Sequence, residues 1–201
     1  YLGEAVVSTQ LVVRNLARIA RLMDNFKLLA ADGDSTRIAR VNLYELVESL
    51  MADHRQLLRE EEIDLTMECD QSIEMTTAPA VLESVLVSLV INAKNHAFAT
   101  GDRKAITITG TLKGPYRVVV TVSDNGCGIA LDDLPRICDA FFTTRREQGH
   151  LGLGLHLAYT QINGRLHGTI DCRSTVGEGT SFSIELPLSY PGELVDSKPA
   201  P

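Results

Sequence analysis

The stretch VSDNGCGIA, residues 122–130, joins a run of β-branched residues to a turn rich in glycine. Residues 118–122 are all valine or threonine, which predicts a strand that ends near Asp124. Gly126 and Gly128 follow this acidic side chain, so the backbone there can turn tightly and approach a bound group without a Cβ in the way. Taken alone, the stretch is equally compatible with a plain Asp-Asn-Gly turn.

The composition describes a globular protein of 201 residues with 44% hydrophobic side chains, enough to bury a core. A net charge of -7 and the scarcity of Lys/Arg clusters argue against a nucleic-acid partner. The four cysteines form no CxxC pair, so we expect reduced thiols and a cytoplasmic protein. No run approaches the roughly 20 apolar residues that span a bilayer, so we expect membrane attachment only through segments that precede this sequence.

Three segments divide the chain. Apolar residues recur at steps of three and four through residues 2–30, which predicts a long helix packed in a bundle, with an ordinary amphipathic helix as the alternative. Turn-forming residues at 32–37 then place a boundary. We therefore expect a helical segment at 1–36, a folded domain at 37–190 and a linker-like tail at 191–201.

The middle segment alternates helices with pairs of strands. Asn42 and Glu45 have the spacing of a capping box, and Pro79 suits the first turn of a second helix. The expected elements are helices from residue 42, at 79–98, at 131–138 and at 153–166, and strands at 63–68, 73–76, 105–112, 116–123, 169–173 and 180–186. With neighbouring strands paired as hairpins, this order predicts a two-layer α/β sandwich whose mixed sheet is covered by helices on one face.

Five motifs occur in a fixed order along this segment. They are INAKNHAF at 91–98, DNGCGI at 124–129, FFTT at 141–144, GHLGLGL at 149–155 and GEGTSF at 177–182. Together they resemble the N, G1, F, G2 and third glycine boxes of sensor histidine kinases, within the superfamily that includes DNA gyrase, heat-shock chaperone and mismatch-repair ATPases. The resemblance covers roughly residues 41–187 and implies the Bergerat type of α/β sandwich. The N-terminal helix resembles the second helix of that family's dimerisation domain.

This resemblance implies ATP and Mg²⁺ as cofactors. Asp124 would accept a hydrogen bond from the adenine amino group, with Thr180 in support, because a carboxylate matches that donor. Asn92 would be the magnesium ligand and a catalytic residue. Arg145 would be a second catalytic residue that reaches a phosphate, although a solvated surface pair of Arg145 and Arg146 is an equal alternative.

The boxes also imply the other nucleotide contacts. Free backbone N–H groups ahead of a helix can meet phosphate oxygens, which suits the glycines of the G2 box. Residues 139–150 would form a lid over the nucleotide. The remaining expected contacts are His96, Gly126, Gly128, Ile129, Phe142, Thr144, Gly149, His150, Leu151, Gly152, Leu153, Gly154 and Leu155.

Two features of the sequence limit the reaction. None of the five histidines stands before the acidic or polar residues and proline that mark the family's phosphoacceptor, so we expect the acceptor to precede Tyr1. Ser88 lies one helical turn before Asn92, where the family commonly has Asn and its ATP-hydrolysing relatives have Glu. A hydroxyl is a poor general base, which disfavours an ATP-hydrolysing clamp and leaves a weaker kinase open.

We therefore predict the ATP-binding catalytic part of a two-component sensor histidine kinase. It would transfer the γ-phosphoryl group of Mg-ATP to a histidine outside this chain, for relay to the aspartate of a response regulator. Its expected partners are a second copy, through the N-terminal helix of the parent protein, and the response regulator. The alternative is a nucleotide-binding pseudokinase that acts as a dimeric signalling module.

Overall fold

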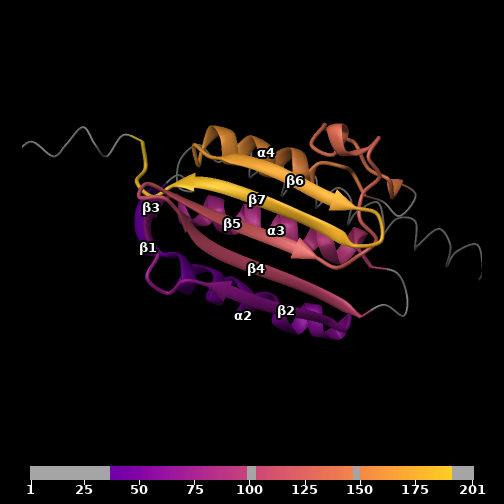
Figure 1. The fold of residues 1–201 in the computed structure, drawn as a ribbon, viewed down its shortest axis with the longest axis horizontal. Coiled ribbons are helices and arrows are strands. Elements are labelled where there is room, and N and C mark those ends of the chain that lie inside the picture. Colours follow the sequence, from indigo (N-terminus) through magenta and orange to yellow (C-terminus); the bar gives the residue numbers. More distant parts are fainter. Residues whose placement is uncertain (1–36, 99–102, 147–149, 192–201) are drawn as a thin grey trace, which may run out of the picture.

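The computed structural model of this protein describes residues 37–98, 103–146 and 150–191 (Figure 1). The expected bundle helix at 2–30 and nearly all of the expected tail lie outside these ranges. In the described part, a mixed sheet and a layer of helices form one core, which confirms the predicted α/β sandwich.

The main sheet has five strands in the order β2-β4-β5-β7-β6. Three neighbouring pairs are antiparallel, and β2 runs parallel to β4, so the sheet is mixed as predicted. The strands are β2 (Ile63–Cys69), β4 (Lys104–Lys113), β5 (Arg117–Asp124), β6 (Thr169–Thr175) and β7 (Gly179–Pro187).

Three α-helices cover one face of this sheet: α2 (Leu43–Glu60), α3 (Pro79–His96) and α4 (Gly154–Gly164). In Figure 1, α2 lies along the β2 edge, α3 behind the central strands and α4 beside β6. Alternate residues of the strands, such as Ile106, Val120 and Ile184, are fully buried against the helices. The residues between them are often hydroxylic, as in the Thr121–Ser183 pair, whose oxygens lie 3.1 Å apart. This alternation explains why only one face of the sheet needs a helical cover.

The expected pairing of the first two strands is wrong. The short strand β3 (Glu74–Thr77) pairs with β1 (Ala39–Asn42), which the sequence did not predict, in a separate two-stranded antiparallel sheet. Strand β2 pairs instead with β4, and α3 lies in the crossover between them. A parallel pair needs such a crossover, so alternating hydrophobicity alone could not reveal the partner.

Of the four helices predicted within the described residues, three are present as α-helices and one is reduced. Asn42 caps α2 as expected, because its Oδ1 accepts a hydrogen bond from the Glu45 N–H at 3.1 Å. The helix predicted at 131–138 is only a 3₁₀ turn, η1 (Leu134–Arg136). Pro135 has no N–H to continue an α-helical ladder, which accounts for the shorter element.

The turn after β5 packs directly on two other elements. A Cβ on Gly126 would lie 2.3 Å from the carbonyl oxygen of Ala97, just beyond α3. Gly128 has φ +70, and a Cβ there would lie 2.1 Å from the carbonyl oxygen of Thr175, at the end of β6. Close packing against neighbouring backbone therefore requires glycine at both positions. This requirement is separate from the predicted approach of a ligand.

Replacing Gly128 by alanine should destabilise the fold strongly. A left-handed backbone costs a residue with a Cβ about 1–2 kcal/mol, and Gly128→Ala should exceed this because it also creates the clash with Thr175. Gly114→Ala is the matched control, because Gly114 has φ +68 and open space around it. Urea denaturation measures both free energies of unfolding, and equal losses in the two variants would contradict the packing role.

Candidate functional site

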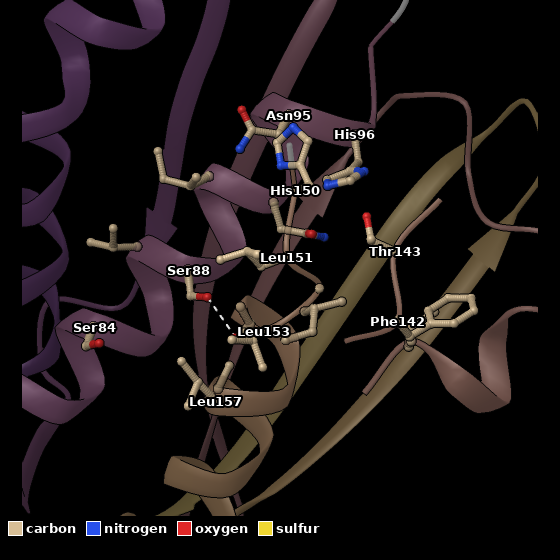
Figure 2. A pocket seen from close by; sticks show the side chains of 18 of the residues that line it. Ser84, Ser88, Asn95, His96, Phe142, Thr143, His150, Leu151, Leu153 and Leu157 are labelled. Atoms are coloured by element: carbon tan, nitrogen blue, oxygen red, sulfur yellow. Dashed lines mark hydrogen bonds between the residues drawn. The ribbon is translucent and has the colours of Figure 1, made fainter. Parts of the chain in front are cut away.

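A cavity of about 690 Å³ lies between α3, α4 and the segments that lead into α4 (Figure 2). We call it the α3–α4 cavity. Its size suits a small-molecule ligand, for which pockets of about 300–1,000 Å³ are usual. Most of its wall surface is apolar, and polar side chains from α3 line one side.

The cavity brings together many of the residues predicted to contact nucleotide. These are Asn92, His96, Ile129, Phe142, Thr144, His150, Leu151, Gly152, Leu153, Gly154 and Leu155. Another group of predicted site residues lies outside its lining: Asp124, Gly126, Gly128, Arg145 and Thr180. Gly149 is outside the described residues.

Helix α3 has one face buried in the core and another that lines the cavity. One face buries seven apolar side chains in the core. The other face presents Ser84, Ser88, Asn92 and Asn95 to the cavity, at the spacing of three and four that keeps residues on one side of a helix. Asn92 therefore reaches the cavity because its neighbours on the opposite face are anchored in the core.

Ser88 links the two helices that enclose the cavity. Its Oγ donates a hydrogen bond to the carbonyl oxygen of Gly154 at 3.1 Å, drawn as a dashed line in Figure 2. The hydroxyl thus fixes the first residue of α4 against α3. This contact gives Ser88, at the position where the sequence departs from the family, a structural role.

The glycine-rich segment before α4 packs on the FFTT motif. Gly152 has φ +68, and a Cβ there would lie 2.3 Å from the carbonyl oxygen of Phe142. The Phe141 N–H also donates to the carbonyl oxygen of Gly152 at 2.9 Å. No side chain caps the N-terminus of α4, which leaves this helix end suited to an anion from outside the chain.

Asp124 and Thr180 meet where β5 pairs with β7. One carboxylate oxygen of Asp124 accepts hydrogen bonds from the backbone N–H groups of Gly126 at 2.9 Å and Thr180 at 3.2 Å. Burial raises the pKa of the Asp124 carboxyl, and these two hydrogen bonds oppose that change. The result is a half-buried carboxyl group held in a fixed orientation.

A short polar network connects this carboxyl to the cavity. The hydroxyl oxygens of Thr180 and Ser174 lie 3.0 Å apart. Ser174 Oγ accepts a hydrogen bond at 2.8 Å from the N–H of Ile129, a residue that lines the cavity. Asp124 does not line the cavity, but hydrogen bonds through Thr180 and Ser174 connect it to Ile129 in the cavity wall.

The two arginines are bound to main-chain carbonyl groups. The Arg145 guanidinium donates to the carbonyl oxygens of Asn95 and His96, at the C-terminus of α3, with 3.1 Å for the bond to His96. Arg146 donates to the carbonyl oxygen of Phe141 at 2.9 Å. Arg145 is half-buried, unlike a solvated surface residue, and caps α3. For either arginine, contact with a phosphate stays a prediction that requires these bonds to be exchanged.

Two histidines meet in the cavity. The rings of His96, at the end of α3, and His150 have centroids 4.8 Å apart and planes tilted by 58°. Burial lowers the pKa of His96 to about 4, and the positive charges of His150 and Arg145 act in the same direction. His96 is therefore a neutral imidazole near pH 7.

The sequence prediction did not include all polar residues of the cavity. Asn95, Ser84 and Thr143 line it as well. Asn95 lies three residues after Asn92 on the same helical face, so helical spacing could have indicated it. Thr143 stands between two predicted contacts, Phe142 and Thr144, but its position in an irregular segment gave no periodic signal.

The described residues thus form an α/β sandwich with a cavity between α3 and α4. Residues 77–190 match the family model described as histidine kinase-, DNA gyrase B- and HSP90-like ATPase. The chain belongs to this family, and it is similar to catalytic domains of sensor histidine kinases.

Two relatives from curated proteins carry sensor-kinase names. The sensor histidine kinase ZraS of Salmonella typhi is 31% identical over 188 residues, which cover 92% of this chain and 39% of that protein. The signal transduction histidine-protein kinase AtoS of Escherichia coli is 31% identical, covering 76% of this chain and 24% of that protein. The chain thus spans less than half the length of these relatives.

Solved structures agree with this assignment. The nucleotide-free catalytic domain of the histidine kinase ThkA is 27% identical with a TM-score of 0.65, covering 76% of this chain and 98% of that one. ThkA in complex with the response regulator protein TrrA is 25% identical with a TM-score of 0.67, covering 86% of this chain and 49% of that one.

Within residues 37–98, 103–146 and 150–191, no helix is long and apolar enough to cross a membrane.

The lowered pKa of His96 should make the free energy of unfolding depend on pH. Below pH 6.5 the unfolded imidazole takes up a proton, whereas the folded one does so only near pH 4. The free energy of unfolding should therefore fall as the pH falls from 6.5 to 4, and His96→Gln should make this slope shallower. The exposed His167, replaced by Gln, is the control in urea denaturation at several pH values. An unchanged slope in His96→Gln would contradict the assignment.

Proposed function

We propose that this chain is the catalytic part of a two-component sensor histidine kinase, which binds Mg-ATP and transfers the γ-phosphoryl group to a histidine elsewhere in the parent protein. The observation that supports this most is the meeting of Asn92 and the glycine-rich residues 150–155 in one cavity, with Asp124 joined to it through Ile129. These are the groups expected at the metal, phosphate and adenine positions.

Asp124 recognises adenine in this proposal. A carboxylate offers about four lone-pair positions, and two backbone N–H groups occupy sites on one of its oxygens. The acceptor capacity that remains matches the exocyclic amino group of adenine. Because the two backbone bonds fix the carboxyl group, little freedom is lost when the base binds.

Asn92 and the N-terminus of α4 hold the other end of the nucleotide. The amide oxygen of Asn92 is a ligand type that Mg²⁺ accepts, and the rest of its octahedral shell is normally water and phosphate oxygen. The residues present therefore fit this cofactor. When bound, magnesium neutralises charge on the phosphate oxygens. The uncapped N–H groups of α4 and the positive end of its dipole favour the triphosphate.

The acceptor, a second copy and a response regulator complete the proposed reaction. None of the five histidines has the sequence context of an acceptor, so transfer goes to a histidine on the dimerisation domain of the parent protein. The structure of ThkA with TrrA supports a response regulator as the partner that takes the phosphoryl group next. We place the reaction in the cytoplasm, where ATP is supplied, and expect dimerisation through the N-terminal helix.

A pseudokinase is the second candidate. The Ser88 hydroxyl donates its hydrogen bond to the carbonyl oxygen of Gly154, and Arg145 and Arg146 donate to backbone carbonyl groups. These contacts hold the catalytic side of the cavity in a fixed form, which would suit a protein that binds nucleotide without transfer. A direct transfer assay separates the two candidates.

Asp124→Asn should weaken Mg-ATP binding by about 1–3 kcal/mol, the cost of leaving a buried donor unsatisfied. The Asn carbonyl can still accept from the Gly126 and Thr180 N–H groups, while its amide would face the adenine amino group donor to donor. Calorimetric titration measures the loss. The exposed Asp171, replaced by Asn, is the control, and parental affinity in Asp124→Asn would place adenine elsewhere.

The proposed transfer is tested with radiolabelled ATP and a supplied dimerisation domain that carries the acceptor histidine. We expect no label on this chain alone and label on the acceptor when both are present. Asn92→Ala should reduce this labelling by more than it reduces nucleotide binding, since the metal acts most on the transferring oxygens.

Asn163→Ala, on the exposed face of α4, is the control for Asn92→Ala. Acid-labile label on the isolated chain would reveal an internal acceptor. Binding of ATP without any transfer to a folded cognate acceptor would favour the pseudokinase. Equal losses of binding and transfer in Asn92→Ala would remove the proposed role of Asn92.

A further inference from the structure

His96 and His150 form an imidazole pair that the proposed magnesium chemistry does not explain. One ring comes from the last residue of α3 and the other from the segment that leads into α4. Figure 2 shows the two rings next to each other, with the Asn95 side chain close by, and all three residues line the α3–α4 cavity. Magnesium prefers oxygen ligands, so it gives no reason for two adjacent imidazoles.

The spacing of the two rings fits a shared metal ion. Imidazole nitrogens bind zinc at about 2.0–2.1 Å, so two rings on one tetrahedral zinc have centroids roughly 5 Å apart. The observed separation of the centroids is 4.8 Å, with the planes tilted by 58°.

We propose that His96 and His150 together bind a transition-metal dication of the kind that imidazole prefers, such as Zn²⁺, Ni²⁺ or Cu²⁺. Across the described ranges there is no group of three or more His, Cys, Asp and Glu side chains that could hold a metal, so the site has two protein nitrogens as its base. Water, or the amide oxygen of Asn95, completes the coordination. A neutral imidazole is the form that coordinates a metal.

Metal binding at this pair has a consequence for nucleotide. The ion would join the C-terminus of α3 to the segment before α4, on the wall where the triphosphate is expected. It would also occupy both imidazoles, which are themselves expected nucleotide contacts. We therefore infer that zinc and Mg-ATP exclude each other, a step that rests on the proposed function, whereas the metal site itself does not.

Calorimetric titration of zinc into the nucleotide-free chain tests the site. We expect one binding event that is lost in both His96→Gln and His150→Gln and kept in His167→Gln. Circular dichroism confirms that the variants are folded. A zinc affinity that survives both histidine substitutions would overturn the proposal.

The thiol of Cys127 is an alternative zinc ligand that a separate variant tests. This exposed thiol lies close to the pair, with its Sγ 3.5 Å from the carbonyl oxygen of His96. Cys127→Ser should keep zinc binding, and the visible spectrum of the cobalt-loaded chain should lack the thiolate charge-transfer band that a Cys ligand gives. Loss of binding in Cys127→Ser with retention in the histidine variants would assign the metal to the thiol and overturn the histidine site.

Mutual exclusion is measured separately, with Mg-ATP titrated at fixed free zinc concentrations set by a metal buffer. The apparent Kd for nucleotide should rise with zinc in the parent chain and stay constant in His150→Gln. A constant Kd in the parent would overturn the exclusion while the titration without nucleotide still reports on the metal site. Failure of Mg-ATP to bind at all would count against the proposed function alone.

Discussion

The backbone contact between the turn after β5 and the residue just beyond α3 is the constraint on which the site depends. The Cys127 N–H donates to the carbonyl oxygen of Ala97 at 2.7 Å, and the Gly177 N–H donates to the carbonyl oxygen of Cys127 at 2.9 Å. On the other side of the turn, the Asn125 side chain accepts from the N–H of Ala105 at 2.8 Å. These bonds join the helical layer, the start of β4 and the β6–β7 hairpin at one point, and glycine is needed beside them because any Cβ would separate the backbones.

Once the end of α3 is fixed there, the rest of the site follows from ordinary packing. The buried face of α3 sets the rotation of the helix, so Asn92 and Asn95 face the cavity. Ser88 then holds the start of α4, and Arg145 satisfies carbonyl groups that the end of α3 leaves without helical partners. Hydrogen bonds within the protein thus hold Ser88 against the start of α4 and Arg145 against the C-terminus of α3.

Much of the fold could be predicted because the signals are local. Asn42 and Glu45, Pro79 and the alternating strands mark their own elements through caps, dihedral limits and side-chain period. The errors occur where partners are distant in sequence. Strand β1 has only four residues, and β3 pairs with it rather than with its neighbour β2, while Pro135 shortens the helix predicted at 131–138.

The sequence by itself determined the order of the five motifs, and with it the family and the α/β sandwich, and it predicted Asp124, Asn92 and the glycines as site residues. Each of these depends on residue type and spacing along one chain. Only the tertiary structure decided that Arg145 caps α3, that Ser88 binds Gly154 and that His96 meets His150. These contacts join residues 49, 66 and 54 positions apart in the sequence. No local pattern encodes such pairs, because they exist only after the core has fixed the positions of α3 and α4.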